Sequence, residues 1–185
     1  MLPCHARSAL FGMSITLCGL SVGSAHAFGP LEDKTVTSLK DAQTAVNAIW
    51  TTLPLTGEHA MFVSEKAPIF GAYKPRPDST FKPGETLLTY IEPVGYAWEP
   101  AADGMFAFGV SLDFEILTPD GKILGGQKNF LSYATASHAK VKELMLTASL
   151  NLDGFPAGSY ALHYTLRDLK SPKVAEISLP FKIAE

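Results

Sequence analysis

The most regular feature of the chain is the alternation of apolar and polar residues over residues 105–117. Apolar side chains occupy every second position from Phe106 to Ile116, and Asp113 and Glu115 fall between them. A period of two predicts a β-strand with one face in a core and the other toward water. The turn Thr118-Pro119-Asp120-Gly121 follows, because proline presets its first angle and glycine tolerates the left-handed one. We therefore expect a hairpin that returns through residues 122–130, with a bulge or a weak edge at Gly125-Gly126.

Similar patterns predict five further strands. Residues 142–152, 160–166 and 174–183 alternate clearly, and shorter strands are expected at residues 60–65 and 85–92. Short turns rich in glycine, proline and aspartate separate these strands, and no helix alternates with them. About seven strands of this kind predict an all-β fold, an antiparallel β-sandwich, and argue against a parallel α/β fold.

One segment, residues 38–53, has a helical period. Its apolar positions recur at steps of three and four and lie on one face: Leu39, Ala42, Val46, Ile49, Trp50 and Leu53. Ser38 is placed to cap the start of the helix, and Pro54 ends it. We expect this helix to dock on the core through Trp50; a membrane-binding or partner-binding role is the alternative.

The first 27 residues have the composition of an export signal. Arg7 supplies the early charge, residues 9–22 are apolar, and Ala25-His26-Ala27 is an A-x-A cleavage site. The apolar stretch is too short for a comfortable membrane span. We predict cleavage after Ala27, an N-terminal segment at residues 28–58 that holds the helix, and a β-sandwich domain at residues 59–185.

Both cysteines, Cys4 and Cys18, lie in the predicted signal. The residues before Cys18 lack the small side chains of a lipoprotein signal. The expected mature chain therefore has no disulfide, and it excludes a cysteine nucleophile, a thiolate metal site and dithiol redox chemistry.

Charge argues against a nucleic-acid partner. Loss of Arg7 leaves 14 basic residues against 18 acidic ones in the expected mature chain, a net charge of −4, and the charges form no run of one sign. A nucleic-acid partner requires a basic face that neutralises phosphates.

Several short motifs together resemble bacterial immunoglobulin-like domains. They are Phe81-Lys82-Pro83-Gly84-Glu85 before a strand, the Thr118–Gly121 hairpin, Pro156-Ala157-Gly158-Ser159-Tyr160, Leu166-Arg167-Asp168, and Phe181-Lys182-Ile183. Residues 60–183 also resemble uncharacterised exported sandwich proteins of proteobacteria. The resemblance implies an immunoglobulin-like sandwich in the periplasm, with Tyr160 as a structural tyrosine corner. It implies no catalytic residue set.

Two chemical alternatives remain open. His59, His138 and His163 have no metal-ligand spacing, but with Met61, Met105 or Met145 they define a hypothetical copper or zinc site. No G-x-S-x-G motif is present. Asp113 and Glu115 lie about 7 Å apart on one strand face, a separation that a small glycan-active enzyme would use.

The aromatic stretch TYIEPVGYAWEP, residues 89–100, is the strongest candidate for binding. It follows a proline-punctuated segment, residues 70–77, that carries an aromatic residue and two cations. The predicted ligand-binding residues are Tyr73, Arg76, Tyr90, Glu92, Tyr96 and Trp98, with the rings of Tyr73, Tyr96 and Trp98 stacking on the ligand and Arg76 and Glu92 orienting it. The alternatives are a local pairing of Arg76 with Glu92 or Glu99, and rings that fold back to cap the core. The sequence favours a non-catalytic exported binding or accessory protein without a cofactor, whose partner is a peptide, a protein or a glycan.

Overall fold

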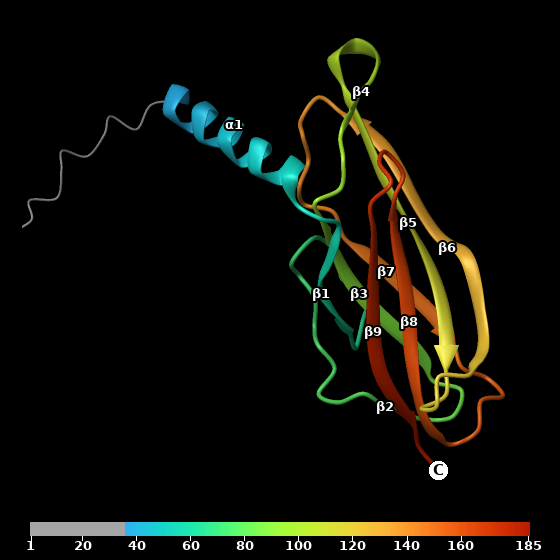
Figure 1. Cartoon of the computed structure of the whole chain (residues 1–185). Coiled ribbons are helices and arrows are strands. Elements are labelled where there is room, and N and C mark those ends of the chain that lie inside the picture. The colour runs from blue at the N-terminus through green and yellow to red at the C-terminus, as the bar shows by residue number, and fades with distance from the viewer. Residues whose placement is uncertain (1–35) are drawn as a thin grey trace, which may run out of the picture. The chain divides into compact units, whose positions relative to one another are not determined.

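The computed structural model describes residues 36–185 (Figure 1). The predicted export signal and cleavage site lie outside the described residues. The chain is mostly β with one N-terminal helix, as predicted. The elements are α1 (Val36–Thr52), β1 (Thr56–Phe62), β2 (Thr80–Phe81), β3 (Thr86–Val94), β4 (Glu99–Pro100), a 3-10 turn (Ala102–Gly104), β5 (Phe106–Leu117), β6 (Ile123–Ser137), β7 (Leu146–Asn151), β8 (Gly158–Asp168) and β9 (Val174–Ile183).

The strands form two sheets. The smaller sheet has the order β1-β3-β7, and the larger has the order β2-β9-β8-β5-β4 with β6 paired to β5. Within residues 36–185 every strand pair is antiparallel except the short β2–β9 pair. No helix in this part of the chain combines the length and the apolar character needed to cross a membrane.

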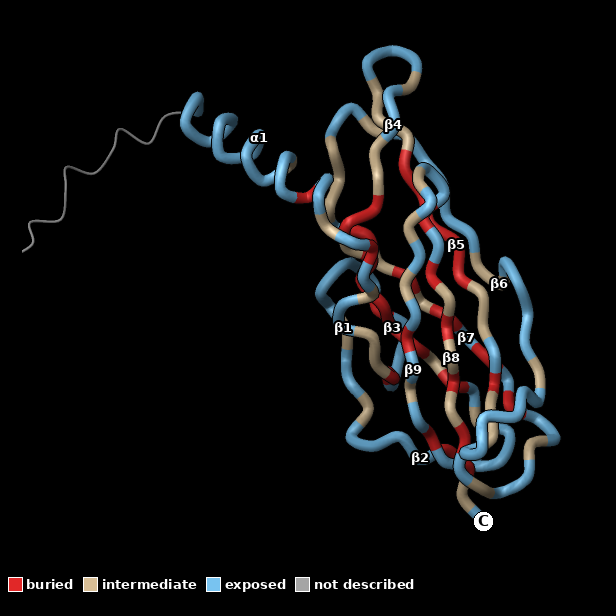
Figure 2. The backbone as a smooth tube through the Cα atoms, in the orientation of Figure 1, coloured by how far each residue is buried: buried red, intermediate tan, exposed pale blue. Residues whose placement is uncertain are grey.

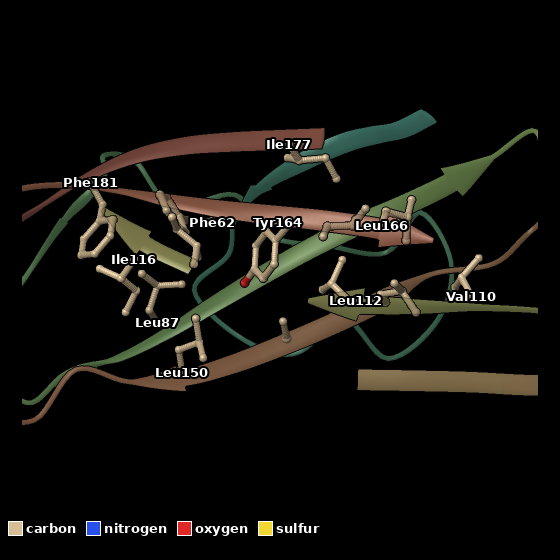
Figure 3. Packing of buried hydrophobic residues seen from close by; sticks show 14 of the residues in the cluster. Phe62, Leu87, Val110, Leu112, Ile116, Leu150, Tyr164, Leu166, Ile177 and Phe181 are labelled. Carbon is tan, nitrogen blue, oxygen red and sulfur yellow. The ribbon is translucent and has the colours of Figure 1, made fainter. Parts of the chain in front are cut away.

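One apolar core fills the space between the two sheets. Figure 3 shows side chains of both sheets in one cluster, with Leu87 and Leu150 from the smaller sheet and Leu112 and Leu166 from the larger one. The predicted inward face of β8 is confirmed, because Tyr160, Leu162, Tyr164 and Leu166 are all buried. A hydrogen bond of 3.0 Å from the Tyr164 hydroxyl to Thr89 Oγ1 crosses the core between the sheets. The alternation in the sequence therefore identifies the side chains of β8 that pack in the core.

The hairpin after β5 forms as predicted. Gly121 N donates to Thr118 O at 2.9 Å, and the return strand β6 pairs along the whole of β5. β6 continues to Ser137, well beyond the predicted end at residue 130. The sequence signal fails there because β6 is an edge strand and most of its residues are exposed on both faces.

β1 lies a few residues earlier than predicted, at Thr56–Phe62 rather than at residues 60–65. Its register with β3 shifts between Glu58 and Met61, and His59 has a positive φ of 47°. This irregularity breaks the alternation of side chains, so a period of two could not locate the start of the strand.

Tyr160 is a structural residue, as expected. Its hydroxyl donates a hydrogen bond of 2.7 Å to Pro156 O, and its ring stacks on Phe181 with centroids 5.5 Å apart. The bond ties the turn before β8 to the strand itself, which is the geometry of a tyrosine corner.

The helix docks on the core through Trp50, as expected, but the rest of its apolar face does not. Trp50 is the only buried residue of α1, and the first three turns of the helix are exposed (Figure 2). Leu39, Val46 and Ile49 keep about half or more of their surface exposed. Ser38 lies within the described bounds of α1. Periodicity identified the apolar face correctly but could not show that only the last turn reaches the core.

Candidate functional site

Tyr96 and Trp98 form the socket that holds the last turn of α1. The Trp50 ring lies 5.4 Å from the Trp98 ring in a stacked arrangement and 5.3 Å from the Tyr96 ring in an edge-on one. Trp50 Nε1 also donates to Tyr96 O at 2.8 Å. We call Tyr96 and Trp98 the aromatic socket. Aromatic pairs of this kind stabilise by about 0.5–1.5 kcal/mol each beyond the burial of their surface.

Hydrogen bonds fix the socket from its far side. The Tyr96 hydroxyl and Trp98 Nε1 both donate to Val141 O, each at 2.9 Å. Ala97 N between them donates to the buried carboxylate of Asp168 at 2.8 Å. Burial raises the pKa of Tyr96 above its usual range. Tyr96 is therefore a core residue that no ligand ring can reach, and Trp98 presents one face to Trp50.

Lys173 fixes the carboxyl end of α1. Its Nζ donates to Leu53 O at 2.7 Å and to Gly95 O at 2.8 Å. A cation at this end of a helix is favourable because the last carbonyls carry partial negative charge. Gly95 has a φ of 82°, and a side chain there would strike Pro54 O. The helix is thus attached at one end by a ring stack, a cation and a close backbone contact.

Tyr73, Tyr90 and Glu92 lie elsewhere, on the outer face of the smaller sheet. The Tyr90 hydroxyl donates to Glu92 Oε1 at 2.7 Å and accepts from Gly71 N at 2.8 Å. The Tyr73 ring covers Tyr90 with centroids 4.6 Å apart. Burial and the Glu92 carboxylate raise the pKa of Tyr90 to about 12. Tyr90 therefore fastens the loop at residues 63–79 to the sheet, and it is too deeply buried to meet a ligand.

Arg76 makes a third, separate set of contacts. Its Nη1 pairs with Glu85 Oε1 at 2.6 Å, and the guanidinium lies 4.2 Å from the Phe81 ring centroid. Glu99, one of its expected partners, pairs with Lys170 at 3.0 Å instead. The six residues predicted to bind ligand are divided among three structural clusters, so the predicted aromatic groove does not form from them. These residues are close in sequence, but β3 runs between residues 73–76 and residues 96–98 and separates them in space.

The apolar face of α1, which the sequence assigned to docking with partner binding as the alternative, is exposed apart from Trp50. Val36, Leu39, Val46 and Ile49 are 71%, 58%, 49% and 62% exposed. We call these four residues, with Ala42, the apolar stripe. The signal for it was the spacing of three and four residues, which was interpreted as a core-facing surface. An apolar surface that the fold leaves uncovered is a common mark of an interaction site.

The structure also places the residues of the two chemical alternatives, the copper or zinc site and the paired carboxylates. Among residues 36–185, no group of three or more histidine, cysteine, aspartate or glutamate side chains is arranged to hold a metal ion. His59 Nε2 lies 4.0 Å from Glu92 Oε2, and these two side chains do not make a group of three. Asp113 and Glu115 line a hollow of about 310 Å³ on the outer face of the larger sheet.

Comparisons with known proteins provide no functional assignment. No family model and no curated protein matches the chain. Among solved structures, the chain is similar to the Pseudomonas fluorescens alkylpurine DNA glycosylase AlkC bound to DNA containing an abasic site analog. The identity is 10% and the TM-score 0.40, over 71% of this chain and 31% of that one. A likeness at this level carries no argument about activity.

Proposed function

We propose that the protein is an exported, non-catalytic binding protein that holds a partner protein on the apolar stripe of α1. The observation that carries this proposal is the exposure of the stripe on a helix whose last turn is fixed in the core. An exposed apolar surface favours a partner, since covering it stabilises the complex by about 25 cal/mol for each Å² of apolar area.

The anchoring of α1 supports a binding role. A helix of 17 residues is marginal in water unless packing stabilises it, and α1 packs only through its last turn. The aromatic socket and Lys173 fix the direction of that turn. A partner that recognises the stripe therefore meets a surface with much of its orientation already set, which lowers the entropic cost of association.

The charge of α1 favours a protein partner over a membrane. Lys40 and Asp41 are its only charged residues, so the helix carries no net charge. A helix that lies on an anionic membrane needs several basic residues beside its apolar face. A protein groove that receives an amphipathic helix needs only the spaced apolar anchors that the stripe supplies.

The dimensions of α1 favour a partner groove over a second copy of the helix. Seventeen residues make a helix about 25 Å long. Two such helices side by side bury less than the standard interface of about 1,600 Å². A groove that surrounds the helix on more than one side covers more of each stripe residue. We therefore infer that the partner is a protein that receives α1 in an apolar groove.

We also place the protein among immunoglobulin-like sandwich proteins of the periplasm. The antiparallel strands and the Tyr160–Pro156 hydrogen bond support the fold class. The predicted signal supports export. N-terminal sequencing of the protein from a periplasmic fraction tests both the compartment and the cleavage site, with Phe28 as the expected first residue.

The experiment for the binding role compares two faces of one helix. A photo-crosslinking amino acid at Val46 lies in the apolar stripe, and one at Thr44, which is exposed on another face of α1, is the matched control. We expect crosslinks in cells from Val46 to one discrete partner, and their loss when Ile49→Glu is added. Purified partner should bind the Thr44→Glu variant as well as wild type and the Ile49→Glu variant at least tenfold more weakly. Equal crosslinking from both faces, or crosslinks only to a second copy of this chain, would overturn the proposed partner groove.

A further inference from the structure

We propose that the outer face of the larger sheet carries a second binding site, for a short neutral glycan, in the hollow above β5, β6 and β8. The hollow measures about 310 Å³, at the lower end of the range of small-ligand pockets. The polar groups that line it come from three strands: Asp113, Glu115, Gln127, Lys128, Thr165 and Arg167. No residue of α1 belongs to it, so this inference goes beyond the proposed function and stands apart from it.

A bulge in β6 builds one wall of the hollow. Leu112 pairs with Leu131 but Phe114 pairs with Gln127, so residues 128–130 lie outside the regular ladder opposite Asp113. Asn129 in this bulge has a φ of 50°, and its N–H donates to Asp113 Oδ1 at 2.7 Å. A left-handed non-glycine residue is costly, and it persists where the surrounding contacts determine it. Bulges of this kind re-aim side chains beside functional sites.

The floor of the hollow also depends on a close backbone approach. Gly126 lies against β5, where an added Cβ would come within 2.5 Å of Phe114 O. The Phe114 ring is held edge-on by Phe130 at 4.8 Å between centroids. Both of these rings pack against the core, so the apolar part of the lining is Ile123, which is 54% exposed and suits the C–H face of a sugar ring.

An ion pair fixes the polar part of the site in advance. Arg167 Nε donates to Asp113 Oδ2 at 3.0 Å, and the Asp113 side chain is only 13% exposed. Burial opposes the charge on Asp113, but the Asn129 N–H and Arg167 outweigh it and lower the pKa of the carboxyl. Both terminal nitrogens of the guanidinium keep no hydrogen-bond partner among residues 36–185. They are therefore available as a pair of donors on a rigid support.

The balance of charges determines the class of ligand. Asp113 and Glu115 face Arg167 and Lys128, so any ion entering the hollow meets as many like charges as opposite ones. A hydroxyl group donates to a carboxylate and accepts from a guanidinium or an ammonium group at the same site. A ligand with several neutral hydroxyls satisfies both kinds of group. Since the hollow is shallow, we expect affinities in the millimolar range, where binding releases about 4 kcal/mol.

The test is a titration of the ¹⁵N-labelled mature protein, followed by NMR, with maltose, cellobiose, lactose and N,N′-diacetylchitobiose. We expect at least one disaccharide to shift the backbone amides of Gln127, Lys128 and Thr165 saturably, with no shift in α1. Glu115→Ala should weaken that binding at least fivefold, because it removes an exposed acceptor from the lining. Glu143→Ala, an exposed acid outside the hollow, is the matched control and should leave it unchanged.

Three outcomes would overturn the site. They are no saturable shift with any of the four sugars at about 50 mM, equal weakening by the two variants, or tighter binding of inorganic phosphate at the same amides. Because neither Val46 nor Ile49 lines the hollow, failure here leaves the crosslinking result on α1 unaffected.

Discussion

Trp50 and Trp98 stack with their ring centroids 5.4 Å apart and their planes 22° from parallel. Trp50 belongs to the last turn of α1, whereas Trp98 lies in the segment that precedes β5. Since Trp50 is the only buried residue of the helix, this contact determines how α1 leaves the core.

Replacement of Trp50 by alanine should release α1 from the sheets. The variant loses both ring contacts and the hydrogen bond to Tyr96 O, so we expect a loss of about 3 kcal/mol or more in the free energy of unfolding. Urea unfolding measures this loss, and hydrogen exchange should show faster exchange throughout residues 36–52.

The matched variant Trp50→Phe keeps a ring in the socket but cannot donate to Tyr96 O. It should lose about 1 kcal/mol and retain slow exchange at the end of α1. If Trp50→Ala leaves exchange in the helix unchanged, another contact must anchor it.

Lys173→Met should weaken the carboxyl end of α1. The change removes the charge that contacts Leu53 O and Gly95 O, and we expect a loss of about 1–2 kcal/mol. Lys170→Met is the control, since Lys170 pairs with the exposed Glu99 and such surface pairs contribute about 0–1 kcal/mol. Thermal and urea unfolding of the two variants should separate them; equal losses would argue against helix capping by Lys173.

The Arg76–Glu85 pair should make stability depend on pH in the acid range. The Lys82 N–H, which donates to Glu85, and the Arg76 guanidinium hold the pKa of Glu85 below its ordinary value of 4.5. The folded state therefore binds this proton less tightly than the unfolded state does. The contribution is fully present above about pH 4.5 and is lost as pH falls through the folded pKa.

Glu85→Gln tests this dependence. It should cost about 1 kcal/mol at pH 7, and its difference from wild type should shrink when unfolding is measured at pH 5, 4 and 3. Glu65→Gln, at an exposed position, should stay within about 0.5 kcal/mol of wild type at each pH. A gap for Glu85→Gln that does not change with pH would contradict the assignment.

Ionisation of Tyr90 should lower the free energy of unfolding at alkaline pH. Its pKa is about 12 in the folded protein and about 10 in the unfolded chain, so the unfolded state releases this proton first. Stability should therefore fall as pH rises from about 10 to 12, and Tyr90→Phe should show a smaller fall.

At neutral pH the same Tyr90→Phe variant should be about 1–3 kcal/mol less stable, because it leaves the buried Glu92 without its donor. Tyr73→Phe is the control, since the Tyr73 hydroxyl makes no hydrogen bond within residues 36–185. Urea unfolding at pH 7, 10 and 11 measures both effects. Identical alkaline slopes for wild type and Tyr90→Phe would contradict the role of this residue.

The strands were predictable where one face is buried and the other is not. β8 and β9 show the expected alternation, and their inward residues are the ones that fill the core. β6 and β1 were placed less accurately, because β6 is an edge strand and β1 is broken at His59. Side-chain alternation weakens when both faces of a strand meet water or when its register shifts.

The candidate sites were less predictable because each depends on contacts between distant segments. The sequence left open whether Tyr96 meets a ligand or caps the core, and the structure shows the second, because Trp50 and Val141 enclose it. The apolar stripe was visible as a period, whereas its exposure was not. Asp113 was recognised, but Arg167 on β8 and the Asn129 bulge determine what its carboxylate does.

By itself, then, the sequence determined the local features of this protein: one helix, the strands with a buried face, their turns, and the side of each strand that faces the core. Backbone geometry fixes these within a few residues, so a local pattern is enough to reveal them. The tertiary structure alone decided that α1 presents its apolar face to solvent, that six clustered residues separate into three sets, and that β6 forms a hollow beside β5. These depend on the packing of the whole core, where the total burial of many side chains determines which distant segments meet.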